Sequence, residues 1–245
     1  MITGEDRELF ARSLRQAVTS RSGDALDKAL DEIGWRDALV DDTRTAVSLL
    51  FALQGEANAT SRALERVVSA CGATDVVVRS GSGLDRAVSL VDVGGPAYAV
   101  AVGRLALAHE LVGAARAMLE LARVHALERV QFGGPIARFQ AVRHRLAESL
   151  VAIEAASDAA DAAWDDGSPL AASVAKAISG RNAGVVARHC QQVLAGVGFT
   201  IEHPFHNYLR RVITLDHLLG DSKTLTREIG QQLLTARRLP AMLPL

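Results

Sequence analysis

Apolar positions recur at helical spacing over most of the chain. Between 97 and 127 they run from Tyr98 through Leu105, Leu111, Met118 and Leu121, a repeat that places them along one side of a long helix. The same periodicity predicts further helices over 5–20, 24–34, 43–71, 138–165, 169–195, 205–217 and 222–238. Helices joined by such short connections suit an up-down-up-down bundle.

Glycines and polar residues mark where these helices should bend or end. Gly34 is expected to end the second helix and to place Trp35 on a loop or turn. Gly55 and Asn58 predict a break or bend inside the third helical segment. The alanine-rich tract over 152–163 is expected to form a close-packed helix face and not a linker.

A single stretch departs from helical periodicity. Val76, Val77 and Val78 and the later run 87–93 read as two strands joined by an SGSG turn, which is about one hairpin in size. The chain is therefore expected to be mainly all-α. Its predicted parts are an N-terminal helical region over 1–73, a β linker over 74–96 and a C-terminal four-helix bundle domain over 97–245.

Composition and charge narrow the class of protein. Hydrophobic residues make up 49% of the 245 residues, which is enough for a sizeable core. The near balance of 27 basic and 28 acidic residues gives no electrostatic reason to bind nucleic acid or an anionic membrane. The charged start of the chain lacks a signal-peptide core, and no run approaches the ~20 apolar residues of a membrane span. We therefore expect a soluble, cytoplasmic protein with neither nucleic acid nor membrane as a partner.

The cysteines and histidines form no pattern typical of a disulfide framework or a metal site. Cys71 and Cys190 are far apart in the sequence and are expected to be reduced thiols. His203, His206 and His217 lie at spacings of three and eleven, without a carboxylate or cysteine pattern beside them. No metal is therefore expected.

Two stretches carry more specific chemistry than a plain amphipathic helix requires. The first, over 128–149, joins an arginine, a Phe-Gly-Gly-Pro corner and a helix start: ERVQFGGPIARFQAVRHRLAES. The second, over 192–211, sets two glycines after a helix end: QVLAGVGFTIEHPFHNYLRR. Taken one at a time these residues have ordinary interpretations, namely a surface arginine, core aromatic residues, a capping glutamine and glycines that turn the chain.

Together the two stretches resemble the C-terminal helical domain of the acyl-CoA dehydrogenases, flavoenzymes that introduce an α,β double bond into acyl-CoA thioesters. The family's pattern is approximately R-x-Q/T-F-G-x-P-I-x-x-F/H-Q, followed later by Q-x-x-G-G-x-G-F/Y-x-x-E-x-P and a helix with arginine. The matching residues are Arg129, Gln131, Phe132, Gly133, Pro135, Ile136, Phe139 and Gln140, then Gln192, Gly196, Gly198, Phe199, Glu202, Pro204 and Arg210. The resemblance covers about 97–238, and LDEIGW at 30–35 is a weaker echo of the family's N-terminal helices.

The resemblance implies a cofactor. In the family these motifs hold the pyrophosphate and adenosine end of FAD, often an FAD that is bound mainly by the neighbouring subunit. Guanidinium groups pair with phosphate oxygens, and backbone N–H groups beside glycines can do the same. The implied FAD contacts come from Arg129, Gln131, Phe132, Phe139, Gln140, Gln192, Val193, Leu194, Ala195 and Gly196. Ala195 stands where the family has a glycine, so a looser backbone approach is expected there.

Two features depart from the family. Its middle domain is a β-barrel around the flavin ring, whereas the segment 74–96 is too short for a closed barrel. Its catalytic glutamate aligns with Leu219, and the position that another branch uses falls at about Gly103. Neither residue accepts a proton. The nearby Asp221 reads first as an N-cap of the last helix.

Three hypotheses follow. In the first, the chain is a degenerate subunit of an α2β2 acyl-CoA dehydrogenase that resembles steroid-degrading actinobacterial members, and it shares FAD with a full-length partner that supplies the barrel and the base. In the second, it is a non-enzymatic helical bundle that has lost FAD. In the third, it is a homomeric dehydrogenase that uses Asp221 or another acid. The retained arginine, aromatic and glutamine set favours the first.

Overall fold

Helices follow one another along the chain and are interrupted by two short β ribbons. The computed structural model describes residues 4–79 and 90–237. Its N-terminal elements are α1 (Gly4–Ser20), α2 (Asp24–Glu32), α3 (Trp35–Asp41), α4 (Thr43–Ala57), α5 (Ala63–Ala70) and the strands β1 (Asp75–Arg79) and β2 (Leu90–Gly94). The later elements are α6 (Ala97–Glu128), β3 (Val130–Gln131), β4 (Gly134–Pro135), the 3-10 helix η1 (Ile136–Arg138), α7 (Gln140–Asp166), α8 (Pro169–Leu194), the 3-10 helix η2 (Ala195–Phe199), α9 (Phe205–His217) and α10 (Ser222–Ala236).

The expected fold class, mainly all-α with a C-terminal helical bundle, is confirmed. The two predicted strands pair as one antiparallel ribbon, in which Val76 lies opposite Val93. The SGSG turn predicted between them lies outside the described residues. Within the described part of the chain, each helix is too short or too polar to cross a bilayer.

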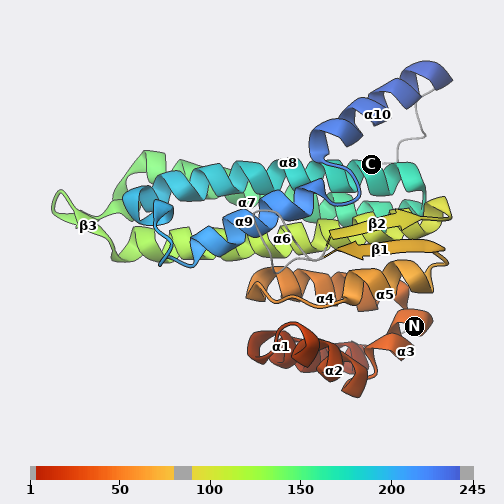
Figure 1. Cartoon of the computed structure of the whole chain (residues 1–245). Coiled ribbons are helices and arrows are strands. Elements are labelled where there is room, and N and C mark those ends of the chain that lie inside the picture. Colours follow the sequence, from red (N-terminus) through yellow and green to blue (C-terminus); the bar gives the residue numbers. More distant parts are fainter. Residues whose placement is uncertain (1–3, 80–89, 238–245) are drawn as a thin grey trace.

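The longest helices, α6, α7 and α8, run side by side in alternating directions, and α9 packs against α6 and α8 (Figure 1). The face that α7 turns inward carries Ala156, Ala160 and Ala163, and such small residues let helix backbones approach closely. The alanine-rich tract is therefore a packed face, as predicted. In contrast, α10 leans away from the bundle (Figure 1) and buries only Leu225 among its residues.

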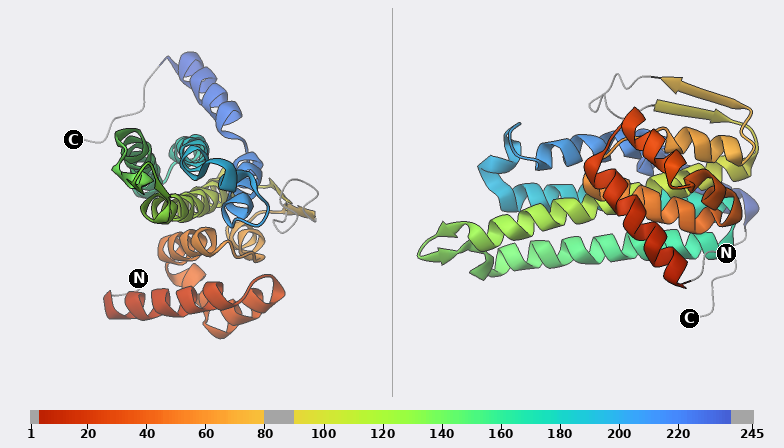
Figure 2. Two further views of the ribbon diagram at one scale, coloured as in Figure 1. Left: turned by 90° about the vertical axis from the view of Figure 1, so that its left-hand side faces the viewer. Right: turned by 90° about the horizontal axis from the view of Figure 1, so that it is seen from below.

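The N-terminal helices join the bundle through a close crossing of α4 and α6. Figure 2 shows α1 on the side of α4 that faces away from the bundle. A Cβ atom on Gly55 would lie 2.2 Å from the carbonyl oxygen of Glu110, and one on Gly113 would lie 2.0 Å from that of Ala52. Gly55 is therefore a contact point inside an unbroken helix. The predicted break falls at Asn58, whose left-handed φ of 51° ends α4.

Trp35 begins a helix, so its predicted position on a loop is wrong. Gly34 takes a left-handed φ of 77°, which reverses the chain in one residue and lets α3 start at once. The Trp35 side chain is fully buried, and its Nε1 donates to the carbonyl oxygen of Ala46 at 3.0 Å. Burial of the indole therefore decides the local structure at this position.

A buried histidine links α6 to α7. The indole Nε1 of Trp164 donates to Nε2 of His109 at 3.0 Å, so the neutral ring carries its proton on Nδ1. Burial lowers the pKa of His109 to about 4. Protonation would place a second donor against the indole N–H in an apolar site.

Acid should therefore weaken the fold through His109. Between pH 6.5 and pH 4 the unfolded chain binds a proton that the folded chain does not, so the free energy of unfolding falls as the pH falls. We expect a loss of about 2.5 kcal/mol between pH 7 and pH 4.5 from this group. Urea unfolding of the native chain and of His109→Gln, which keeps an acceptor for Trp164, measures the difference. Parallel pH curves for the two proteins would refute this assignment.

Candidate functional site

The two predicted motifs lie at one end of the bundle. Because the long helices alternate in direction, the end of α6, the start of α7 and the end of α8 come together there. Figure 1 shows the β3–β4 hairpin at the left, projecting beyond the helices, with the loop between α8 and α9 at the same end. We call the described residues 129–140 and 192–201 the bundle end.

The Phe-Gly-Gly-Pro corner of the sequence is a tight β-hairpin. Val130 pairs with Pro135 and Gln131 with Gly134, which leaves Phe132 and Gly133 as a two-residue loop. Both loop residues have positive φ, 53° and 85°, as a type I′ turn requires. After Pro135 the short 3-10 helix η1 leads directly into α7.

Two aromatic side chains lie outside the core, that of Phe132 in the hairpin loop and that of Phe139 directly after η1. Phe132 is 84% exposed and Phe139 is 37% exposed. Their ring centroids are 6.0 Å apart and their planes meet at 83°, the edge-to-face arrangement that aromatic pairs favour. The pair therefore presents an open aromatic surface at the bundle end.

Arg129 has a fixed backbone and an exposed guanidinium. Its N–H donates to the carbonyl oxygen of His125 at 2.8 Å, and its own carbonyl oxygen accepts from Ile136 at 2.8 Å. Among residues 4–79 and 90–237, no carboxylate pairs with the guanidinium. Gln131 and Gln140 are also exposed at the bundle end. This set offers hydrogen-bond donors of the kind that bind phosphate.

The second motif places some of its predicted residues on the surface and others in the core. Gln192, Ala195 and Gly196 are exposed, whereas the side chains of Val193 and Leu194 are 5% and 1% exposed. Only the backbone of the latter two could reach a ligand. A Cβ atom on Gly196 would meet no atom within 4 Å, so the chain is open there.

Ala195 keeps a conformation that favours glycine. Its φ of 52° and ψ of −134° lie in a region that residues with a Cβ rarely adopt. Its N–H donates to the carbonyl oxygen of Gln191. Residue 195 therefore takes a backbone conformation typical of glycine although it is an alanine. The two motifs share one end of the molecule but stand on separate loops, and no hydrogen bond or ring contact joins the ten predicted residues across them within the described residues.

The two positions where a catalytic glutamate would be expected meet in space. Leu219 and Gly103 are distant in sequence, yet a Cβ atom on Gly103 would lie 2.7 Å from Cδ1 of Leu219. The leucine side chain therefore fills the space into which a side chain at 103 would project. An apolar contact stands where the resemblance would place a carboxylate.

Two cations hold the turn that carries Leu219. Arg104 donates from Nε to the Leu219 carbonyl oxygen at 2.9 Å. Lys176, fully buried on α8, donates to the carbonyl oxygens of Asp216 at 2.9 Å and Gly220 at 3.3 Å. Burial lowers the pKa of Lys176 to about 8. Leu219 and Gly220 both have positive φ, 54° and 104°, so these contacts stabilise a strained turn.

The acids near this turn are already engaged. Asp221 caps α10 by accepting from the N–H groups of Lys223 and Thr224 at 3.1 Å and 3.0 Å, as predicted. Hydrogen bonds from Thr224, first its side chain and then its backbone, lower the pKa of Asp221 to about 2. Asp216 accepts from the N–H and hydroxyl of Ser222. A carboxylate with so low a pKa is a weak base.

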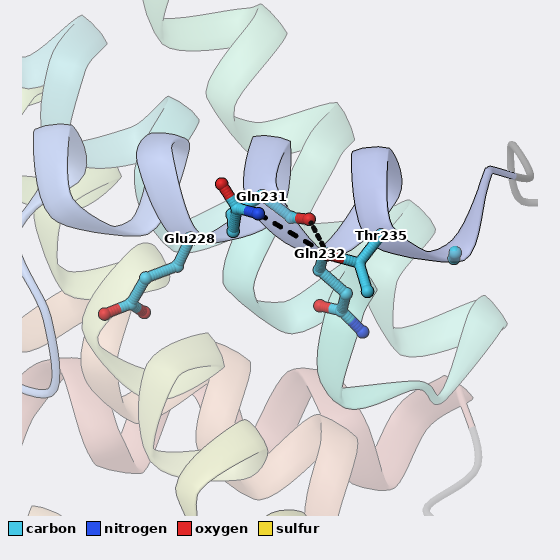
Figure 3. Close-up of a pocket in the computed structure, with 5 residues that line it drawn as sticks. Glu228, Gln231, Gln232 and Thr235 are labelled. Atoms are coloured by element: carbon cyan, nitrogen blue, oxygen red, sulfur yellow. Dashed lines mark hydrogen bonds between the residues drawn. The ribbon is translucent and has the colours of Figure 1, made fainter.

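Two pockets lie along α10, away from the bundle end. Figure 3 shows the side chains of Glu228, Gln231, Gln232 and Thr235 beside a pocket of about 520 Å³. A pocket of about 290 Å³ lies between α10 and the facing ends of α7 and α8. Neither includes a motif residue. In the described part of the chain, no three His, Cys, Asp or Glu side chains are arranged to hold a metal ion.

Two residues that shape these regions were not among those predicted from the sequence. Lys176 interrupts the apolar face of α8, and a lone lysine inside such a face was the available signal. Arg138 lies against Phe139, with its guanidinium carbon 5.1 Å from the ring centroid. The family pattern leaves that position open, so nothing in the resemblance pointed to it.

The sequence of the chain matches a known protein family. Residues 96–234 match the family described as "Acyl-CoA dehydrogenase, C-terminal domain". Acyl-CoA dehydrogenase FadE34 of Mycobacterium tuberculosis is 45% identical over 130 residues, which are 50% of this chain and 18% of FadE34. Acyl-CoA dehydrogenase IpdE2 of the same organism is 33% identical over 126 residues, which are 51% of this chain and 40% of IpdE2. The chain thus spans less than half the length of these curated relatives.

Solved structures share the fold. A variant of the Tcur3481-Tcur3483 steroid ACAD has a TM-score of 0.81 at 18% identity, and the match covers 96% of this chain and 99% of that one. A glutaryl-CoA dehydrogenase from Mycobacterium smegmatis in complex with FADH2 has a TM-score of 0.57 at 19% identity, and the match covers 69% of this chain and 50% of that one. At these identities the likeness shows the architecture alone.

Proposed function

The chain belongs to the acyl-CoA dehydrogenase family, and from that premise we propose that it is one subunit of an FAD-dependent enzyme that desaturates an acyl-CoA thioester. Its contribution is to bind the nucleotide end of an FAD whose flavin ring lies in a partner subunit. A bulky, steroid-type acyl-CoA is the proposed substrate class, and the cytoplasm the proposed location. The name of the steroid ACAD that shares the fold supports this substrate class.

The observation that carries the proposal is a set of exposed polar and aromatic side chains at the bundle end, in a chain whose middle segment is too short for a β-barrel. The exposed arginine, aromatic pair and glutamines of the bundle end are present together. Yet only residues 71–96 separate α5 from α6, and the described part of that segment is a two-stranded ribbon. A ribbon of two strands cannot close into a barrel that encloses a ring. Nucleotide contacts without a ring pocket point to a shared FAD.

The residues of the bundle end fit the nucleotide end of FAD. The exposed Arg129 guanidinium suits the pyrophosphate oxygens. The Phe132–Phe139 surface suits the flat apolar face of adenine. The Gln131, Gln140 and Gln192 amides, with the backbone near Gly196, supply further polar groups. FAD itself, when bound, supplies the hydride acceptor, and this chain binds and orients it.

The partner must supply the base as well as the barrel. Leu219 and Gly103 pack against each other, and neither can take the α-proton of a substrate. A full-length acyl-CoA dehydrogenase subunit would provide a glutamate. Support comes from the steroid ACAD whose name joins Tcur3481 to Tcur3483, because the matched chain has nearly the same extent as this one.

A second candidate function is a structural helical bundle that no longer binds FAD. The Leu219–Gly103 contact and the short β ribbon favour it. It leaves unexplained why two large aromatic rings remain exposed at one end together with an arginine that pairs with no carboxylate among residues 4–79 and 90–237. A self-sufficient enzyme that uses Asp221 is disfavoured because that carboxylate caps α10.

Purification of the chain alone and with its partner separates these functions. The partner to co-express is a full-length acyl-CoA dehydrogenase subunit, sought first among the genes that neighbour this one. We expect the lone chain to be colourless and the co-purified complex to show the flavin absorption bands, because each protein supplies only part of the site. FAD retained by the lone chain, or a colourless complex, would contradict the proposal.

A further inference from the structure

We propose that Arg138 is a positioning residue that holds the Phe132–Phe139 pair in the orientation that receives the nucleotide end of FAD. This inference rests on the proposed function of the bundle end. It adds a residue to which neither the family pattern nor its motif gives a role.

The hairpin loop is strained at Phe132. Its φ of 53° lies in the left-handed region, where a residue with a bulky side chain is a conformational outlier. Asparagine, aspartate and glycine are the usual residues at this position of such a turn. A phenylalanine persists there only when surrounding contacts over-determine the turn.

Arg138 supplies two such contacts. Its Nη2 donates to the carbonyl oxygen of Phe132, which fixes the strained residue. Its guanidinium carbon lies 5.1 Å from the centroid of the Phe139 ring, within the range of a cation–π contact. One side chain therefore ties the loop to the second aromatic ring.

Gly134 makes room for this arrangement. A Cβ atom at 134 would lie 3.0 Å from Nη1 of Arg138 and 3.4 Å from its Cδ, closer than almost all real Cβ contacts. The absence of a side chain at 134 thus lets Arg138 lie across the hairpin. The second glycine of the Phe-Gly-Gly-Pro corner has a different purpose from Gly133, which provides a positive φ of 85°.

As a result, the aromatic pair remains exposed to solvent. Phe132 is 84% exposed, although a ring of this size gains free energy when apolar surface leaves water. Held by Arg138, the ring stands at 83° to that of Phe139 and does not fold onto the bundle. A preorganised pair loses less conformational entropy when a planar base packs on it.

The test uses the complex of this chain with its full-length partner, stripped of flavin and titrated with FAD. Arg138→Met keeps the aliphatic stem but removes the hydrogen bond and the cation–π contact, and we expect the Kd for FAD to rise about tenfold. Arg138→Lys, which keeps the charge, should raise it about threefold. Arg143→Met, an exposed arginine on α7, is the matched control and should leave the Kd unchanged.

Two readouts separate positioning from a general structural role. FMN lacks the adenosine, so Arg138→Met should leave FMN affinity unchanged, whereas a distorted complex would weaken both flavins. In a Phe132→Ala background, Arg138→Met should have a smaller further effect, because one of the two rings that Arg138 positions is then absent. Equal losses for FAD and FMN, or fully additive losses with Phe132→Ala, would overturn the inference.

Failure of this inference can be told from failure of the proposed function. If Arg129→Ala weakens FAD binding and Arg138→Met does not, only the role of Arg138 is wrong. If neither variant changes the Kd, the bundle end does not bind FAD and both ideas are wrong. Size-exclusion chromatography checks assembly. If Arg138→Met does not assemble, the Arg138→Lys complex decides, and an unchanged Kd there overturns the inference.

Discussion

Replacement of Arg211 by methionine should lower the free energy of unfolding by about 3–5 kcal/mol. The Arg211 side chain is 2% exposed and that of Glu110 is 5% exposed. Nε and Nη2 of Arg211 both contact Oε1 of Glu110, and Nη2 also donates to the carbonyl oxygen of Ala59. Methionine would leave the Glu110 carboxylate buried without this cation, which is the costly way to break an ion pair.

This pair joins three parts of the chain. Glu110 lies on α6, Arg211 on α9, and the Arg211 guanidinium also donates to Asn58 Oδ1 at 3.4 Å beyond the end of α4. Its loss should therefore loosen the attachment of the N-terminal helices to the bundle. Chemical denaturation followed by circular dichroism measures the change.

Two further variants test the cause of that loss. The double variant Arg211→Met with Glu110→Gln removes both charges and should recover part of the stability. Arg123→Met breaks the exposed Arg123–Glu120 pair on the same helix and should leave the denaturation midpoint in place. If Arg211→Met left the midpoint unchanged as well, the buried pair would not be what holds α9 to α6.

The helices could be predicted from the sequence because apolar periodicity is a local signal. Only fold-level packing distinguishes adjacent residues such as Arg210 and Arg211. The family pattern contains Arg210, whereas the fold buries Arg211 against Glu110, which lies 101 residues away. The prediction that Trp35 lies on a loop or turn was wrong for a similar reason, since the helix that it begins depends on burial beside Ala46 and not on local propensity.

In the candidate site, too, residues of a contiguous motif could be predicted, whereas contacts between distant parts of the chain could not. Arg129, Phe132 and Phe139 could be selected because their motif is contiguous, and all three are exposed at the bundle end. The contact between Leu219 and Gly103 could not be foreseen, because it joins α6 to the turn before α10. Burial of Val193 and Leu194 follows from the helical spacing of α8, which a motif read residue by residue does not take into account.

The second large effect is expected on FAD affinity when Arg129 is replaced by alanine. In the complex, Arg129→Ala removes a guanidinium that no carboxylate within the described residues neutralises. A charge-assisted bond to phosphate is stronger than a neutral one, and its loss should raise the Kd for FAD about 30- to 100-fold. The stability of the chain should change little, because the side chain is exposed and the Arg129 backbone bonds remain.

The measurement that tests the shared site most directly is the FAD content of the purified complex carrying Arg129→Ala, set beside the same complex carrying Arg143→Ala. Each variant removes one exposed arginine, Arg129 from the bundle end and Arg143 from the first turn of α7 beyond it. Our account predicts that the Arg129 variant assembles but loses its flavin on gel filtration, while the Arg143 variant stays yellow. An Arg129→Ala complex that retains as much FAD as the unaltered one would contradict it.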